Sequence, residues 1–272
     1  GERFSVMNAA NDGFTGKSAR VLELAPDGSL WIGTNTAGLY CYHEGLFTRY
    51  GLEDGLPDLS VRSIAIDGEG TVWAGPANGV SRLEHPRFVP AVPAGSPKIG
   101  IANFLLPLHD GTVIVGTNMN GLWLITPTGL ESYLGDQGAA SWSFSAGVLD
   151  GSGQLGTSSG LILRVTRNEI RERFSPDYLN GASVNTFYTD TDGTLWMATD
   201  RGILARRGNS FEFFSESNGL PSNVVSSLCK DREGNLWVGT ERGGLVKFSQ
   251  GKFVNTSKRD GLVSDAVNAV TE

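Results

Sequence analysis

Residues Asp27 to Thr34 read DGSLWIGT, and this stretch decides the fold because the chain repeats it. Related stretches are EGTVWAGP from Glu69, DGTVIVGT from Asp110, DGSGQLGT from Asp150, DGTLWMAT from Asp192 and EGNLWVGT from Glu233. The glycines in their second positions are spaced by 42, 41, 40, 42 and 41 residues. Self-similarity at such a steady period predicts a repeat architecture.

Each copy has the composition of a short antiparallel sheet. An acidic residue followed by glycine is typical of a tight turn, and the apolar and aromatic residues after it are typical of a buried strand. A second glycine, such as Gly38, precedes another short apolar run, and a third run such as FTRY follows. With the run ahead of the turn, each period holds four strands, which predicts the blade of an all-β propeller.

The count of strands gives six complete repeats and two extra terminal strands. Complete units are expected at about 17–50, 59–92, 101–134, 142–175, 182–215 and 223–256. Residues 2–7 resemble the fourth strand of a blade, and residues 264–272 resemble a first strand. We therefore expect residues 1–272 to form a single β-propeller domain. A seven-bladed parent ring is favoured, with six blades as the alternative.

Charge and composition exclude several classes of protein. The formal charge is −7 and no run of Lys or Arg occurs, so no nucleic-acid partner is expected. No apolar stretch of about 18 residues suggests a membrane span. The three histidines, His43, His85 and His109, fall in separate turns, so neither a metal site nor another cofactor is expected.

Candidate binding residues come from the sorting of propeller loops. Loops between second and third strands share one end of the blades with the connections between blades, and we call this the top end. Amides, charged groups and aromatics there suit a polar ligand, although hairpin loops are rich in Asn, Ser and Asp in any case. The leading candidates are Trp142, Asn120, Arg201 and Arg242, followed by Asn118, Asp200, Glu241 and Tyr178.

The unit D-x-x-G-x-L-W-x-G-T-x-x-G-L closely resembles the two-component regulator propeller repeat. The match is carried by Asp231 to Leu245, Asp190 to Ile203 and Asp67 to Val80. The resemblance implies a segment of a longer sensor, the periplasmic or extracellular part of a membrane-anchored bacterial protein whose output is a histidine kinase or diguanylate cyclase. It also implies a small polar molecule or oligosaccharide as ligand, an adjacent propeller or β-sandwich domain as partner, and allows a homodimer of the parent.

Two other functions stay open. A propeller that serves as a protein-interaction scaffold would use the same loops without a small ligand. A propeller lyase or glycan hydrolase would need acids or a histidine clustered at the top end, where Asp54, Asp200 and Glu241 are the carboxylates to test. Because the sorting of loops puts all three histidines at the opposite end, we expect the chain itself not to be an enzyme.

Overall fold

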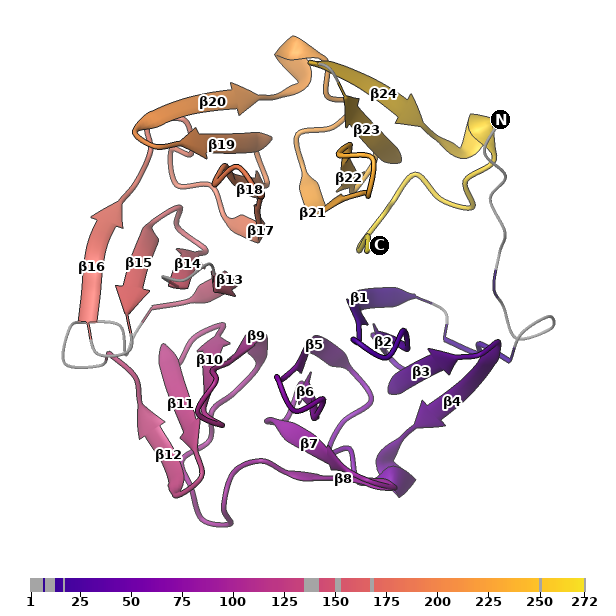
Figure 1. The fold of residues 1–272 in the computed structure, drawn as a ribbon, viewed down its shortest axis with the longest axis vertical. Coiled ribbons are helices and arrows are strands. Elements are labelled where there is room, and N and C mark those ends of the chain that lie inside the picture. Colours follow the sequence, from indigo (N-terminus) through magenta and orange to yellow (C-terminus); the bar gives the residue numbers. More distant parts are fainter. Residues whose placement is uncertain are drawn as a thin grey trace. The chain divides into compact units, whose positions relative to one another are not determined.

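The computed structural model describes residues 7, 13–16, 18–134, 142–149, 153–166, 169–249 and 251–271. These residues form six four-stranded antiparallel sheets, and the strands of each sheet pair in chain order (Figure 1). Blades 1 to 3 consist of β1 (Ala19–Leu24), β2 (Leu30–Thr34), β3 (Leu39–His43) and β4 (Leu46–Tyr50); β5 (Val61–Ile66), β6 (Val72–Pro76), β7 (Ser81–Glu84) and β8 (Arg87–Pro90); β9 (Ala102–Pro107), β10 (Val113–Thr117), β11 (Leu122–Thr126) and β12 (Gly129–Ser132). Blades 4 to 6 consist of β13 (Phe144–Leu149), β14 (Gly153–Thr157), β15 (Ile162–Thr166) and β16 (Glu169–Phe174); β17 (Val184–Thr189), β18 (Leu195–Thr199), β19 (Ile203–Arg207) and β20 (Ser210–Phe214); β21 (Val225–Lys230), β22 (Leu236–Thr240), β23 (Leu245–Ser249) and β24 (Lys252–Thr256).

The blade count settles the choice between the two arrangements predicted above. All six expected units are present, and the fold is an all-β propeller with six blades. The seven-bladed arrangement that the sequence favoured is not formed by the described residues. Residues 1–6, which belong to the expected N-terminal strand, lie outside the described part of the chain.

The C-terminal residues take the place of a first strand without becoming one. Val267 N donates to Thr240 O at 2.8 Å, and Gly244 N donates to Asp265 O at 2.8 Å. The second bond repeats that from Gly38 N to Leu59 O, which joins blade 1 to the segment entering blade 2. The segment 264–271 has no strand assigned.

The repeated W-x-G-T stretch and the glycine three or four residues after its threonine each have a packing reason. A Cβ on Gly33 would lie 3.1 Å from Val61 Cγ1, so this glycine lets the next blade approach closely. The threonine hydroxyl closes the following loop: Thr34 Oγ1 donates to Gly38 O at 2.8 Å. Gly38 has φ +86°, and its Cβ would collide with Tyr50 O, so only glycine fits there.

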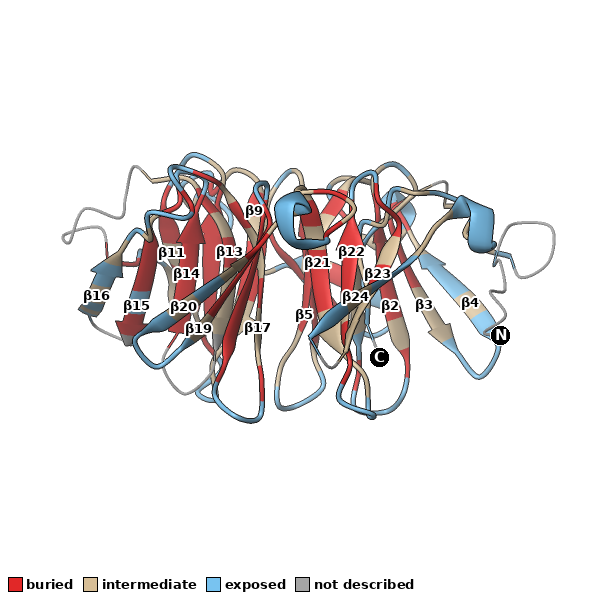
Figure 2. Cartoon of the chain, turned by 90° about the horizontal axis from the view of Figure 1, so that it is seen from above, coloured by how far each residue is buried: buried red, intermediate tan, exposed pale blue. Residues whose placement is uncertain are grey.

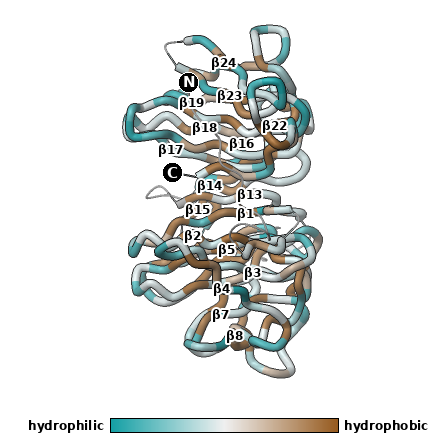
Figure 3. Tube along the Cα trace, turned by 90° about the vertical axis from the view of Figure 1, so that its right-hand side faces the viewer, coloured by the Kyte–Doolittle hydropathy of each residue, from teal (hydrophilic) through white to brown (hydrophobic). Residues whose placement is uncertain are grey.

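The chain divides into two compact units. The described residues of the N-terminal unit lie in Met7–Gly147 and Thr166–Ile170, and those of the C-terminal unit in Val148–Val165 and Arg171–Glu272. Within the N-terminal unit the first strands β1, β5 and β9 pack side by side, as β17 and β21 do in the C-terminal unit (Figure 1). The fourth strands β20 and β24 carry exposed residues along their length, whereas second strands such as β14 are buried throughout (Figure 2). Hydrophobic residues follow the strands and hydrophilic residues gather in the turns (Figure 3).

The tryptophans of the repeat pack between consecutive blades, with one exception. Trp31, Trp73 and Trp196 are 4–5% exposed and lie in apolar clusters that include residues of the following blade. Trp237 is only partly buried, although the sequence predicted a core position for it as well. Blade 6 is followed by the segment 264–271 rather than by a four-stranded sheet, so less of this indole is covered.

Candidate functional site

Hydrogen bonds place the two kinds of predicted binding segments at the same end of the blades. The backbone N–H of Asp200, in the β18–β19 loop, donates to Ser183 O in the connection that leads into blade 5, at 3.3 Å. Glu241 N, in the β22–β23 loop, donates in the same way to Val224 O at 3.0 Å. The sorting of loops that defines the top end is therefore observed in the structure.

The eight predicted ligand residues fall into three groups. Asn118, Asn120 and Trp142 meet at blade 3 in the N-terminal unit, where Gly121 N donates to Trp142 O at 3.1 Å. Tyr178, Asp200 and Arg201 lie beside blade 5, and Glu241 and Arg242 lie in the β22–β23 loop of blade 6, both in the C-terminal unit.

The blade 3 group is engaged in holding its own loop. Asn120 Nδ2 donates to Ile99 O at 3.1 Å and to Lys98 O at 3.4 Å, and Asn120 N donates to Thr117 Oγ1 at 2.9 Å. Trp142 is partly buried, with its ring centroid 6.2 Å from that of Phe144. These contacts give Asn120 a structural role and occupy the Nδ2 donors of its amide, which leaves the Oδ1 acceptor for a ligand.

The blade 6 group is exposed to solvent. Glu241 and Arg242 are both exposed, and no side-chain bond is recorded for either among the described residues. The loop beneath them is fixed, because Gly243 N donates to Thr240 Oγ1 at 2.9 Å and Gly243 lies against Pro221. This loop presents two opposite charges, and no aromatic ring contact is seen for it among the described residues.

The blade 5 group combines an exposed aromatic face with charged side chains. The turn before β17 is anchored by Leu179, which is fully buried, while the preceding Tyr178 remains 53% exposed. The Tyr178 ring stacks on Phe213 of β20, with ring centroids 5.8 Å apart and an angle of 21° between the planes. A flat aromatic surface is thereby held in place at the edge of blade 5.

The loop that carries Asp200 and Arg201 packs against the same aromatic pair. A Cβ on Gly202 would lie 3.2 Å from the Phe213 Cζ atom, so the loop backbone touches this ring. Arg201 N donates to Thr199 Oγ1 at 3.0 Å, which fixes the loop, while the Asp200 and Arg201 side chains are exposed. Of the three groups, this one brings a stacking surface, a carboxylate and a guanidinium together.

Sequence reasoning missed Phe213. The signal was present in SFEFF, because alternation in a strand puts Phe211 and Phe213 on one side of β20. What sequence alone does not give is that Tyr178, from the preceding connection, lies on that side.

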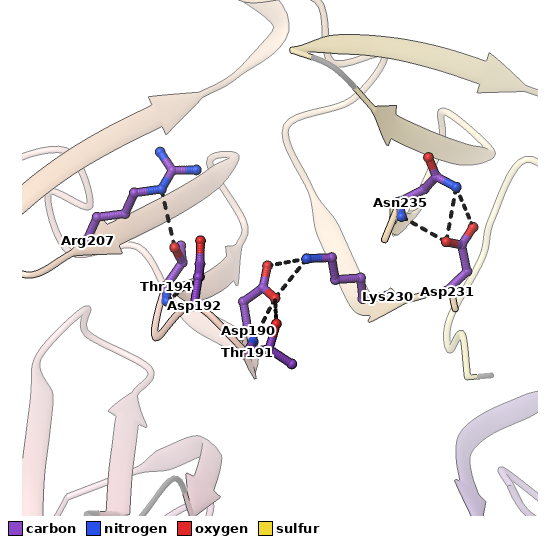
Figure 4. Close-up of polar contacts among 8 residues, drawn as sticks. All are labelled: Asp190, Thr191, Asp192, Thr194, Arg207, Lys230, Asp231 and Asn235. Atoms are coloured by element: carbon purple, nitrogen blue, oxygen red, sulfur yellow. Dashed lines mark hydrogen bonds and ion pairs between the residues drawn. The ribbon is translucent and has the colours of Figure 1, made fainter. Parts of the chain in front are cut away.

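Carboxylates at the opposite end of blades 5 and 6 are held by hydrogen bonds (Figure 4). Lys230 Nζ donates to Asp190 Oδ1 at 2.7 Å and Oδ2 at 2.6 Å, while Asp231 accepts from Asn235 and from Trp237 Nε1 at 2.7 Å. Burial opposes ionisation of Asp190, but the hydrogen bonds from Lys230 and Thr191 and the charge of Lys230 together outweigh it and lower the pKa of this carboxyl. The bond to Asp190 in turn raises the pKa of Lys230. These saturated carboxylates stabilise the turns and are not available for acid–base chemistry.

The three histidines also lie away from the top end. His43, His85 and His109 are exposed and lie at the end of the blades opposite the top end, at or beside the β3–β4, β7–β8 and β9–β10 turns. In the described part of the chain, no three His, Cys, Asp or Glu residues are grouped so as to hold a metal ion. No helix among the described residues has the length and hydrophobicity needed to span a membrane.

Comparison with known proteins connects this fold to signalling proteins. Residues 178–201 and 219–242 match the family described as two component regulator propeller, and these two stretches contain the blade 5 and blade 6 groups. The chain thus carries this repeat, which confirms the resemblance inferred from its motif. The chain has no match among curated proteins.

Solved structures share the fold over most of the chain. The extracellular domain assigned to the hybrid two component system BT3049 from B. thetaiotaomicron has a TM-score of 0.78 and 19% identity, and the match covers 94% of this chain and 36% of that one. The extracellular domain assigned to the one component system BT4673 of the same organism has a TM-score of 0.56 and 22% identity, over 87% and 34%. Virginiamycin B lyase from Staphylococcus aureus has a TM-score of 0.69 and 18% identity, over 88% and 83%. The chain spans about a third of the two extracellular domains.

Proposed function

We propose that this chain is the ligand-binding propeller of a two-component-type sensor and acts in its extracytoplasmic part. Its ligand is a small polar molecule of the oligosaccharide class, bound beside blade 5. The proposed partners are neighbouring propeller or β-sandwich domains of the parent protein, or a second copy of it. Binding would pass to the parent through altered packing against these partners.

One observation carries the proposal: the exposed Tyr178 ring, stacked on Phe213, lies next to the loop bearing Asp200 and Arg201. A sugar offers an apolar C–H face and a rim of hydroxyls, so it requires an aromatic surface together with polar groups. Asp200 can accept hydrogen bonds from hydroxyls, and Arg201 can donate several at once. The likeness to extracellular domains of signalling proteins supports the extracytoplasmic location.

Thermal unfolding in the presence of sugars tests this function. We expect a saturable rise in Tm with at least one member of a panel of maltotriose, xylotriose, digalacturonate and their monosaccharides. A ligand at one hundred times its Kd stabilises the native state by about 2.7 kcal/mol. Tyr178→Ala and Arg201→Gln should abolish the shift while leaving the unfolding transition cooperative.

Leu46→Ala is the matched control for the loss of a large exposed side chain, because Leu46 is 73% exposed in another blade. Arg259→Gln is the control for the loss of charge. If the panel gives no shift, or the shift survives Tyr178→Ala, the blade 5 site is refuted. A partner protein that co-purifies in the absence of any sugar response would favour the scaffold function instead.

A lyase function has one observation in its favour, since the lyase structures match over most of their own length. One of the matched lyase structures is a catalytically inactive histidine-to-alanine variant with quinupristin. In this chain all three histidines lie in the N-terminal unit, at the ends of their blades opposite the top end. We therefore expect no turnover of quinupristin. Turnover by the wild type that is lost in Asp54→Asn, Asp200→Asn or Glu241→Gln would contradict that expectation.

A further inference from the structure

The first strand of five blades has an irregularity at the same place. The pairing with the second strand shifts between Ala19 and Val21 in β1, and equivalent shifts occur in β5, β9, β17 and β21. One residue is left over at each shift, and such bulges re-aim a side chain. The five bulged residues are Arg20, Arg62, Asn103, Asn185 and Ser226.

In three of these blades the bulged side chain binds the next segment of the chain. Asn103 Nδ2 donates to Phe144 O at 2.7 Å, and Asn185 Nδ2 donates to Val225 O at 2.8 Å. Ser226 Oγ donates to Val267 O. A short amide or hydroxyl at the bulge therefore has a clear structural task, which is to tie one first strand to the next.

Blades 1 and 2 have arginine at this position, and arginine does not perform that task. The carbonyl of Ala102, which the bulged residue of blade 2 would reach, is bound instead by Ser63 Oγ at 2.9 Å. Arg62 Nε is buried and has no hydrogen-bond partner. Arg20 makes one long bond, from Nη1 to Asn35 Oδ1 at 3.3 Å. The guanidinium groups of Arg20 and Arg62, on neighbouring first strands, thus keep most of their hydrogen-bonding capacity.

The surroundings leave the two positive charges uncompensated. Burial lowers the pKa of Arg20, and the charge of Arg62 lowers it further, so the two groups repel each other. No ion pair is recorded for either arginine among the described residues. Asp58, in the connection into blade 2, is already bound by Ser60 N at 2.8 Å and Asn78 Nδ2 at 3.1 Å. A buried donor without a partner is costly in any protein.

We propose that Arg20 and Arg62 form a binding site for an oxyanion, a carboxylate or sulfate group of a ligand, at the top end of blades 1 and 2. The fork of N–H donors in arginine matches such groups, and an anion would satisfy Arg62 Nε and relieve the repulsion together. The site lies in the N-terminal unit, on different blades from Tyr178. The inference does not depend on whether the blade 5 group binds a sugar.

Titration with sodium sulfate and with sodium glucuronate, followed by thermal unfolding and calorimetry, tests the site. Sodium chloride at equal ionic strength controls for screening of the repulsion, and glucose controls for the uncharged sugar. We expect saturable binding of sulfate or glucuronate, and the tighter of the two shows whether a tetrahedral or a planar group fits. Arg62→Gln should weaken it about tenfold or more, as expected for a lost hydrogen bond between charged groups.

Two variants separate the charge of Arg62 from its geometry. Arg62→Lys keeps the charge but loses the Nε donor, so it should bind more weakly than the wild type and more tightly than Arg62→Gln. Arg259→Gln removes an exposed arginine from blade 6 and should bind as the wild type does. Neither variant at position 62 should have a lower Tm without anion. Equal responses to chloride and sulfate, or a response unchanged in Arg62→Gln, would overturn the proposal.

Discussion

The β17–β18 and β21–β22 turns carry the same Asp-x-x-Gly pattern, yet their aspartates bind different partners (Figure 4). Asp231 stays within its own blade and accepts from Asn235 and from Trp237 Nε1. Asp190 leaves its blade and binds Lys230 of the next one. One position of the repeat thus closes a turn in one blade and joins two blades in another.

The two positions differ both in the neighbouring strand and in the donors within the blade. Lys230 ends β21, and the corresponding residues of β5, β9 and β17 are Ile66, Pro107 and Thr189, which carry no charge. In blade 2, Asp67 accepts from Trp73 Nε1 at 2.9 Å, as Asp231 does from its tryptophan. Lys230 therefore gives Asp190 a partner in the next blade, whereas a tryptophan of the same blade already binds Asp67 and Asp231.

Among the described residues, Glu23 has neither a lysine nor a tryptophan as donor, and its replacement should have the largest effect on the free energy of unfolding. Burial raises the pKa of Glu23, in β1, to about 7. The folded state then binds this proton more tightly than the unfolded chain, so the contribution of Glu23 to stability is fully present below about pH 4 and is lost as pH rises to about 7. Glu23→Gln should remove this slope and raise the free energy of unfolding at pH 8 by about 3 kcal/mol. Urea unfolding at pH 5 and pH 8 measures the pH dependence of the wild type and the gain in Glu23→Gln, and Glu53→Gln, at an exposed position, is the control. A wild type equally stable at the two pH values would contradict the prediction.

Breaking the bond between blades should cost the next largest amount. Asp190→Ala leaves Lys230 without its partner, and we expect a loss of about 2 kcal/mol, less than for a fully buried pair because Lys230 still reaches water. Adding Lys230→Met should restore about half of the loss. Denaturant unfolding of the four proteins in this cycle gives the coupling energy, and additive losses would show that the pair contributes nothing.

Replacing Asp231, whose hydrogen bonds stay within one blade, should cost less stability. Its contribution should be lost at acidic pH. Burial opposes ionisation of Asp231, but hydrogen bonds from Asn235 and Trp237 outweigh it and lower its pKa to about 2. Its contribution is therefore present above about pH 4 and is lost as pH falls toward 2. Asp231→Asn should cost about 1 kcal/mol at pH 7 and flatten stability between pH 4 and pH 2. A coupling energy between Asp231→Asn and Lys230→Met larger than that between Asp190→Ala and Lys230→Met would contradict the distinction between the two turns.

The smallest effect is expected when the lysine is moved to another blade. Pro107→Lys puts an ammonium at the position of Lys230, facing blade 2, where Asp67 is already bound by Trp73. We expect a change within about 0.5 kcal/mol of Pro107→Met, which shares the loss of proline. Thermal unfolding compares the two variants. A gain of more than about 1 kcal/mol over the methionine variant would mean that a lysine alone recruits the aspartate.

Much of the fold was predictable because the repeat encodes it locally. The turn glycines, the tryptophans and the Thr-x-x-Gly loops each follow from contacts within a blade or with the next one. Trp237 was predicted to be buried with the others and is only partly buried. The six-bladed count also depends on pairing at the termini, which a local pattern does not determine.

The candidate site was predictable only in part. The top-end loops were identified from the order of strands, and Tyr178, Asp200 and Arg201 were among the predicted residues. Their convergence on Phe213 depends on the stacking of two side chains from different segments, which spacing does not reveal. The bulged arginines were not found from the sequence, since a bulge is visible only once the register of both strands is known.

Hydrogen–deuterium exchange with and without the strongest binder among maltotriose, xylotriose and digalacturonate tests the central claim most directly. A ligand held by Tyr178, Asp200 and Arg201 should slow exchange in residues 176–183 and 200–203, while the corresponding loop of blade 6, residues 241–244, stays unchanged. Protection confined to blade 6 or to the N-terminal unit, or no protection at a saturating concentration, would contradict a binding site beside blade 5.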